Sequence, residues 1–88
     1  SLFKMIGRRI KELRTENELT QQELAKILNV SSMSISFYEN GQRKPDSEFI
    51  IACSRLFNVS TDYLLGKTNT KRIQREEKVY HKDKQQKI

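Results

Sequence analysis

Two short amphipathic segments, separated by very few residues, occupy positions 20 to 40 of this 88-residue chain, TQQELAKILNVSSMSISFYEN. The break lies at Leu28-Asn29-Val30-Ser31. Asparagine tolerates the left-handed backbone conformation that ends a helix, and serine is a preferred N-cap. The pattern therefore predicts one helix that ends near Leu28 and a second that begins after Ser31.

The start of the first of these helices is specified by its own side chains. Thr20 is expected to be the N-cap, and Glu23 follows three residues later, which is the spacing of a capping box. Leu19 and Leu24 are placed to form a hydrophobic staple across the same turn. These local signals favour a fixed entry angle for the chain.

The second helix should expose one face. At 3.6 residues per turn, Ile35 and Tyr38 fall on one side, opposite a mixed set of hydroxyl and apolar side chains. That set is Ser32, Met33, Ser36 and Phe37. Core packing is the ordinary explanation for a helical Met or Phe, but their separation from Ile35 argues against it here. A DNA major groove would give such a face a use, because hydroxyls bond base edges or phosphates and apolar groups contact thymine methyls.

The remaining residues predict a small all-α scaffold. Ile6, Ile10 and Leu13 recur at helical spacing, in a helix that should end near Glu16. A further helix should follow Asp46 as N-cap. Its expected apolar arc, with Ile51 outside it, comprises Phe49, Ile50, Ala52, Cys53, Leu56 and Phe57. A last helix should start after Ser60 and end at Gly66, with an apolar face made of Tyr63, Leu64 and Leu65.

Four segments from Ile6 to Gly66 resemble a known family in order and spacing: IGRRIKELR, LTQQELAKIL, VSSMSISFYENGQRKP and NVSTDYLLG. Together they are similar to the phage Cro and repressor helix-turn-helix proteins, also called XRE-like. The resemblance implies a compact five-helix bundle of the lambda repressor-like type, in which the third helix enters the major groove. It covers about three quarters of the chain.

The resemblance also implies roles for individual residues. Gln21 matches the position that opens the second helix against a phosphate. Ser32, Met33, Ser36 and Phe37 match the base-reading positions, while Asn40, Arg43 and Lys44 match the turn that contacts the DNA backbone. Ser31 and Ser34 complete the candidate DNA-binding set. Arg14 and Glu39 match an internal ion pair, although exposed charges are the more common case.

Composition restricts the other possibilities. Cys53 is the only cysteine and His81 the only histidine, so we expect no internal disulfide, metal site, cofactor or catalytic activity. No apolar stretch approaches the length needed to cross a bilayer, and we expect a cytoplasmic protein encoded by a bacterium or phage.

Charge is unevenly distributed along the chain. The net charge is +6, but residues 1 to 66 contain nine basic and eight acidic residues, whereas residues 67 to 88 contain eight and three. We expect one helix-turn-helix domain over 1–66 and a polar, basic tail over 67–88. The tail is either a helix from about Arg72 to Gln86 or disordered. It could attract DNA, extend a dimer arm or bind another protein.

These patterns favour a sequence-specific regulator that binds double-stranded DNA, more specifically a repressor that acts as a homodimer on a twofold operator. An antitoxin that represses its own operon and binds a toxin through its tail is one alternative. The other is a helical protein-interaction module that uses Met33, Phe37 and Ile51 and does not bind DNA. Salt-sensitive binding to duplex DNA would separate the regulator from the interaction module.

Overall fold

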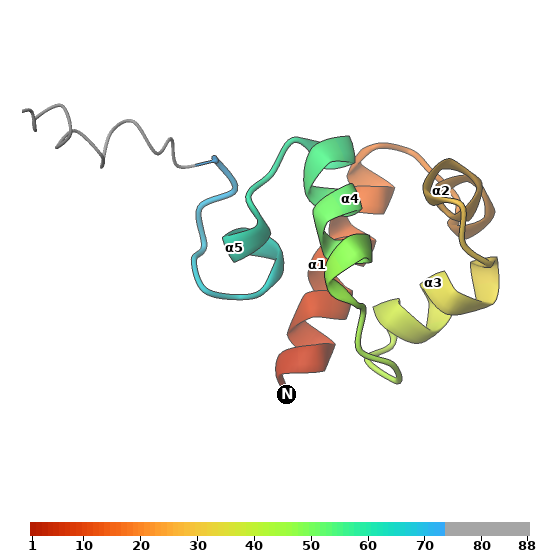
Figure 1. Cartoon of the computed structure of the whole chain (residues 1–88), viewed down its shortest axis with the longest axis horizontal. Helices are drawn as coiled ribbons and strands as arrows, with labels where there is room; N and C mark the ends of the chain where they lie inside the picture. The colour runs from red at the N-terminus through yellow and green to blue at the C-terminus, as the bar shows by residue number, and fades with distance from the viewer. Residues whose placement is uncertain (74–88) are drawn as a thin grey trace, which may run out of the picture.

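The computed structural model describes residues 1 to 73, and five helices account for their regular structure (Figure 1). The helices are α1 (Leu2–Glu16), α2 (Gln21–Leu28), α3 (Ser32–Glu39), α4 (Ser47–Phe57) and α5 (Thr61–Leu64). No strand is present in this part of the chain, so the expected all-α five-helix fold is confirmed. A helix from about Arg72 to Gln86 was one of two alternatives for the tail; residues 72 and 73 are not helical, and residues 74 to 88 lie outside the described residues.

Every helix begins at a side-chain oxygen that accepts a hydrogen bond from a backbone amide of the first turn. These N-caps are Ser1, Thr20, Ser31, Asp46 and Ser60. The four caps from Thr20 to Ser60 were expected from the sequence and are confirmed, as is the capping box between Thr20 and Glu23. Left-handed residues end α2 at Asn29 and α4 at Asn58, with φ angles of 59° and 57°.

A single apolar core joins the helices. It contains Ile6, Ile10, Leu13, Leu24, Ala25, Ile35, Tyr38, Phe49, Ile50, Cys53, Val59, Tyr63 and Leu64. Four expected members are not in this core: Ala52 and Phe57 are half-buried, Leu56 is 38% exposed and Leu65 is 37% exposed. Phe57, the next residue of α4, still packs against the core, so Leu56 is exposed by the direction of its side chain, and Leu65 is the residue after a one-turn helix whose buried side is filled by Tyr63 and Leu64. Ile51 is exposed, as expected.

Helices α1 and α3 approach each other closely at Gly7. A Cβ atom at this position would lie 2.2 Å from the carbonyl oxygen of Tyr38 and 2.6 Å from that of Glu39. Real side chains do not come so close to backbone atoms, so only glycine allows this packing. The contact positions the C-terminal end of α3 against α1.

The chain remains attached to the domain beyond Gly66, where the domain was expected to end. The guanidinium of Arg9 donates hydrogen bonds to the carbonyl oxygens of Tyr63 and Thr68 and lies 4.2 Å from the centre of the Tyr63 ring. The amide of Ser60 donates to the carbonyl of Lys71 at 2.9 Å. Residues 67 to 71 therefore contact the folded domain, and the division into a domain over 1–66 and a tail over 67–88 stays a prediction.

Candidate nucleic-acid interface

A tight turn connects α2 to α3 and fixes their mutual orientation. Asn29 takes the left-handed conformation, and the amide of Val30 donates to the carbonyl oxygen of Ala25 at 3.0 Å. Ser31 then caps α3 directly. Asparagine adopts this backbone more readily than other residues with a Cβ atom, and this explains how the turn forms without glycine. The two-helix unit expected from the sequence is confirmed.

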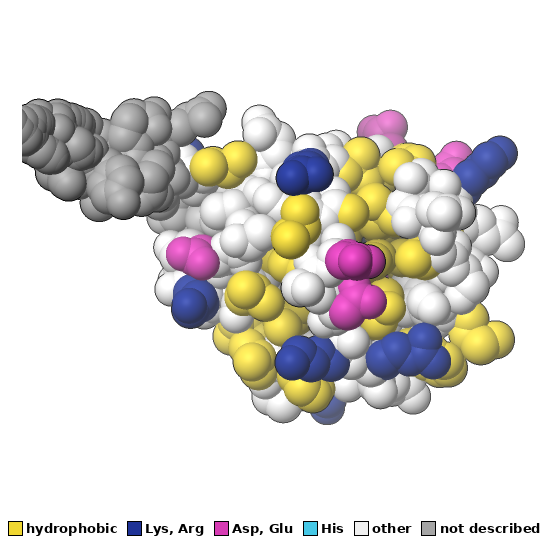
Figure 2. Space-filling model, viewed as in Figure 1, with side chains coloured by type: hydrophobic (Ala, Val, Ile, Leu, Met, Phe, Trp, Pro, Cys, Tyr) yellow, Lys and Arg dark blue, Asp and Glu magenta, His cyan; other side chains and the backbone are white. Residues whose placement is uncertain are grey.

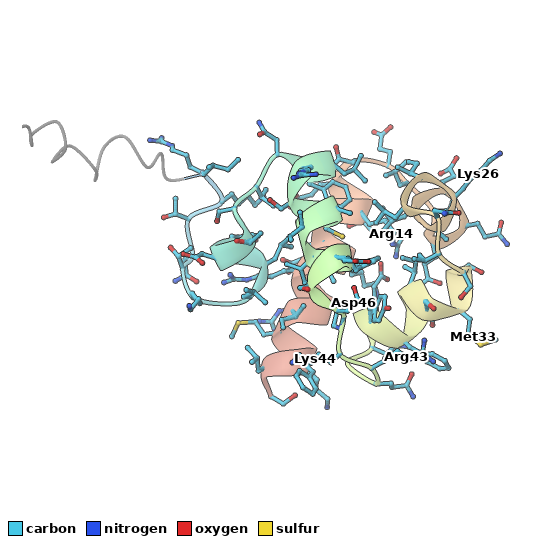
Figure 3. The ribbon with its side chains drawn as sticks, viewed as in Figure 1. Arg14, Lys26, Met33, Arg43, Lys44 and Asp46 are labelled. Atoms are coloured by element: carbon cyan, nitrogen blue, oxygen red, sulfur yellow. The ribbon has the colours of Figure 1, made fainter. Side chains whose placement is uncertain are left out.

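The inner side of α3 anchors it to the domain. Ile35 is fully buried and Tyr38 is 8% exposed, with its ring centre 4.6 Å from that of Phe49 on α4. The opposite side faces outward: Met33 is 65% exposed and projects away from the body (Figure 3). Ser32, Ser36 and Phe37 are half-buried. None of these four side chains is sealed in the interior, as expected.

A bidentate ion pair holds the end of α3. Arg14 Nε donates to Glu39 Oε2 at 2.6 Å, and Arg14 Nη2 donates to Glu39 Oε1 at 3.0 Å. Arg14 Nη1 also donates to the carbonyl oxygen of Leu19 at 2.8 Å. The Glu39 side chain is 1% exposed and that of Arg14 is 11% exposed. The expected structural pair is confirmed, and it links α1, the loop before α2, and α3.

Gln21 takes part in the same network. Its Nε2 donates to Glu39 Oε1 at 3.1 Å, and its side chain is therefore directed toward α3. The sequence offered no sign of this contact, because the partners are 18 positions apart and on different helices. A phosphate contact at Gln21 stays a prediction for the DNA-bound state.

Basic side chains line the edge of the outward face. Arg43 Nη1 donates to Ser34 Oγ at 3.3 Å, and its guanidinium lies 4.7 Å from the centre of the Phe37 ring. Lys44 is exposed beside it (Figure 3). Figure 2 shows the two basic patches in a row on the lower part of this view. Met33 lies beyond the Arg43 end of that row (Figure 3).

The other polar candidates are also near the surface of α3. Asn40 is exposed, and its Nδ2 donates weakly to Ser36 Oγ at 3.5 Å. Ser31 Oγ donates to Ser34 Oγ at 3.0 Å while it caps the helix. The structure thus brings most of the expected residues onto one side of α3 and its following turn, and directs Gln21 inward.

The described residues contain no cluster of three His, Cys, Asp or Glu side chains that could hold a metal ion. Cys53 is fully buried, and burial raises the pKa of its thiol from 9.0 to about 12. His81 lies outside the described residues. Among helices in residues 1–73, none is long and apolar enough to cross a bilayer.

A largely apolar groove lies between α4 and α5, and Lys44 from the basic row also lines it. Its volume is about 670 Å³, and its lining includes Pro45, Ile50, Ile51, Thr61 and Leu65. Ile51 and Leu65 are 43% and 37% exposed. The fold itself leaves these apolar side chains uncovered.

Comparison with known proteins agrees with this arrangement. A family model described as helix-turn-helix matches residues 10–64, which is more than half of the chain. The chain belongs to the XRE-type helix-turn-helix family. The family resemblance inferred from the sequence is therefore confirmed.

Individual members of the XRE-type family are clearly similar to the chain. It is 47% identical over 62 residues to the transcriptional regulator ImmR of Bacillus subtilis, covering 70% of this chain and 49% of ImmR. It is 44% identical over 62 residues to the antitoxin PezA of Streptococcus pneumoniae, covering 70% of this chain and 39% of PezA. The chain thus spans half or less of the length of these two relatives.

A solved structure of the P22 c2 repressor bound to a synthetic operator has a similar fold. The TM-score is 0.68 at 33% sequence identity, and the match covers 73% of this chain and 97% of the repressor chain. Comparison of sequences and comparison of structures therefore both support the helix-turn-helix fold.

Proposed function

We propose that this XRE-type domain binds double-stranded DNA as a transcription regulator and inserts α3 into the major groove. The supporting observation is the division of α3 into an anchored side, with Ile35, Tyr38 and Glu39, and an outward side that carries no core residue. Family membership and the P22 c2 repressor–operator complex support the same role. The role is binding and requires no catalysis.

The outward side chains define the chemistry of recognition. Ser32 and Ser36 supply hydroxyls that can donate to or accept from base edges, and Met33 supplies an apolar contact for thymine methyls. The phosphate backbone is bound at the periphery by Asn40, Arg43 and Lys44, and by Gln21, Ser31 and Ser34 at the starts of α2 and α3. The amides of these helix starts attract anions without adding formal charge.

The proposed regulator acts as a homodimer on a twofold operator in the cytoplasm. One module of this size buries only roughly 600 to 1,000 Å² of its surface against DNA, and pairing doubles the contacts and fixes half-site spacing near 34 Å. The groove with Ile51 and Leu65 offers apolar surface for a second copy. The similarity to the P22 c2 repressor supports repression as the mode of regulation.

Selection of bound sites from a random duplex pool tests the proposal. We expect a palindromic site whose affinity falls steeply with salt, because bound phosphates release counterions. The paired change Met33→Ala with Ser36→Ala should alter the selected half-site without lowering the melting temperature. Arg55→Ala, an exposed change on α4, is the matched control and should leave the site unchanged. No enrichment and no salt-sensitive binding would favour a protein-interaction module.

The similarity to PezA favours a second candidate, an antitoxin that represses its own operon. In that case the same α3 surface binds DNA, and a partner protein binds elsewhere on the full-length protein. Repeated copurification of one stoichiometric partner, encoded beside the gene, would distinguish an antitoxin from a simple repressor.

A further inference from the structure

Phe37 differs from the other outward residues of α3 because the structure already gives its ring a partner. The guanidinium carbon of Arg43 lies 4.7 Å from the ring centre, which is within cation–π distance. The main chain makes a second connection between the same residues. The amides of Gln42 and Arg43 both donate to the carbonyl oxygen of Phe37, at 2.9 and 3.3 Å. The turn after α3 is thus attached to Phe37 through backbone and side chain.

Ser34 completes the arrangement. Its hydroxyl oxygen accepts from Arg43 Nη1 at 3.3 Å and from Ser31 Oγ at 3.0 Å. Ser34 and Phe37 are three residues apart, and they are neighbours on the helix surface. The Arg43 side chain therefore extends from the turn back along one flank of α3 and contacts two successive turns of the helix.

The position of this flank indicates what the guanidinium meets. On the helical wheel, Phe37 lies at the margin of the face formed by Ser32, Met33 and Ser36, and Ser34 lies further round, between Phe37 and the buried Tyr38. When that face enters a major groove, its margin lies next to the wall of the groove, where the phosphates run. A guanidinium stacked by its flat face keeps N–H groups at its edge, and these suit a phosphate.

We propose that Phe37 is a positioning residue, which holds the Arg43 guanidinium at the flank of α3 ready to bind a DNA phosphate, and that it does not read a base. This inference rests on the proposed DNA-binding function. It changes the role that family resemblance suggests for Phe37, and it assigns the phosphate contact to a preorganised Arg43.

Two substitutions of Phe37 separate positioning from base reading. Phe37→Leu keeps an apolar side chain that can touch a thymine methyl but removes the ring, whereas Phe37→Tyr keeps the ring. We expect Phe37→Leu to weaken binding about two- to fivefold on all sequences alike. Phe37→Tyr should stay near the wild-type affinity. A change of preference at one base pair with Phe37→Leu would overturn the proposal.

A double-mutant cycle tests the coupling to Arg43. Arg43→Ala alone should weaken binding to all sequences and reduce the salt slope by about 1. The same change in the Phe37→Leu background should cost clearly less affinity. Additive losses would show that the two side chains act independently and would contradict the inference.

Measurements on the free protein separate this inference from the proposed function. The Phe37 ring should shift the NMR signals of the Arg43 Hδ and Hε protons, and Phe37→Leu should abolish the shift. If the wild type binds DNA but the shift is absent, only the positioning role is refuted. If the shift is present but no salt-sensitive DNA binding occurs, the DNA-binding function fails, and the phosphate role fails with it. Melting curves confirm that the variants fold.

Discussion

Glu39 is a carboxylate almost completely removed from water, and its partners determine whether it can remain there. It accepts from Arg14 Nε and Nη2 and from Gln21 Nε2. We expect Arg14→Met to lower the free energy of unfolding by about 3 to 5 kcal/mol, because Glu39 would keep a buried charge without its cation. Urea denaturation measures the change.

The paired replacement of Arg14 and Glu39 by Met provides the control. It removes both charges, and it should be less destabilising than Arg14→Met alone. If Arg14→Met costs less than about 1 kcal/mol, the pair behaves as an exposed one and the structural role is refuted.

Burial of Cys53 makes the free energy of unfolding depend on pH. The pKa of the folded thiol is raised to about 12 from 9.0, so the folded state retains a proton that the unfolded state loses. The contribution of the Cys53 thiol to the free energy of unfolding is therefore fully present below pH 9, and it decreases as pH rises from 9 toward 12. Urea titrations of wild type and Cys53→Ala should show a steeper alkaline loss in the wild type. Parallel pH profiles would contradict the prediction.

At the scale of helices, the packing of α1 on α3 depends on the missing side chain of Gly7. Ala is the better helix former by about 1 kcal/mol, but the added methyl would meet two backbone carbonyl oxygens. We expect Gly7→Ala to lower the free energy of unfolding by roughly 1 to 3 kcal/mol, because backbone cannot move aside as a side chain can. Arg8→Ala, an exposed change in the same helix, is the matched control in urea denaturation. A higher free energy of unfolding for Gly7→Ala would contradict the prediction, because it would mean that α3 can move away from α1 at little cost.

Arg9 connects α1 to α5 and to the segment after it. Without its guanidinium, the bonds to the carbonyls of Tyr63 and Thr68 are lost. We expect Arg9→Met to lower the opening free energy of residues 67 to 71 by about 1 to 2 kcal/mol, which increases the rate of native-state trypsin cleavage after Lys67 and Lys71 about tenfold. Arg8→Met serves as the control. Equal cleavage rates in both variants would show that Arg9 does not hold residues 67 to 71 against the domain.

Local signals in the sequence were sufficient to predict the helices and the turn. The N-caps at Thr20, Ser31, Asp46 and Ser60 act within three or four residues, so their effect is visible in the sequence itself. The outward face of α3 followed from helical periodicity in the same way. The tertiary contacts of Gly7, Arg9 and Gln21 could not be predicted, because they join residues far apart in the chain. Leu56 and Leu65 were misplaced because periodicity gives the direction of a side chain but not what covers it.

At the scale of the whole molecule, the groove between α4 and α5 should determine the oligomeric state. We expect Ile51→Glu to raise the dissociation constant of the proposed dimer by at least roughly tenfold, because a charge would replace an apolar contact. Ile27→Glu, at an exposed isoleucine of α2, is the matched control and should leave the dimer intact. Sedimentation velocity over a concentration series measures both. A wild-type monomer at every concentration, with normal operator binding, would contradict dimerisation through this groove.

The arrangement of α3 has an evolutionary consequence. Residues that keep the helix in place, such as Ile35 and Tyr38, alternate with Ser32, Met33 and Ser36, which lie outside the core of the domain. A duplicated gene can therefore accumulate changes at these surface positions while its product still folds. A few substitutions at these positions can therefore change the preferred DNA sequence, and the fold is retained after each one.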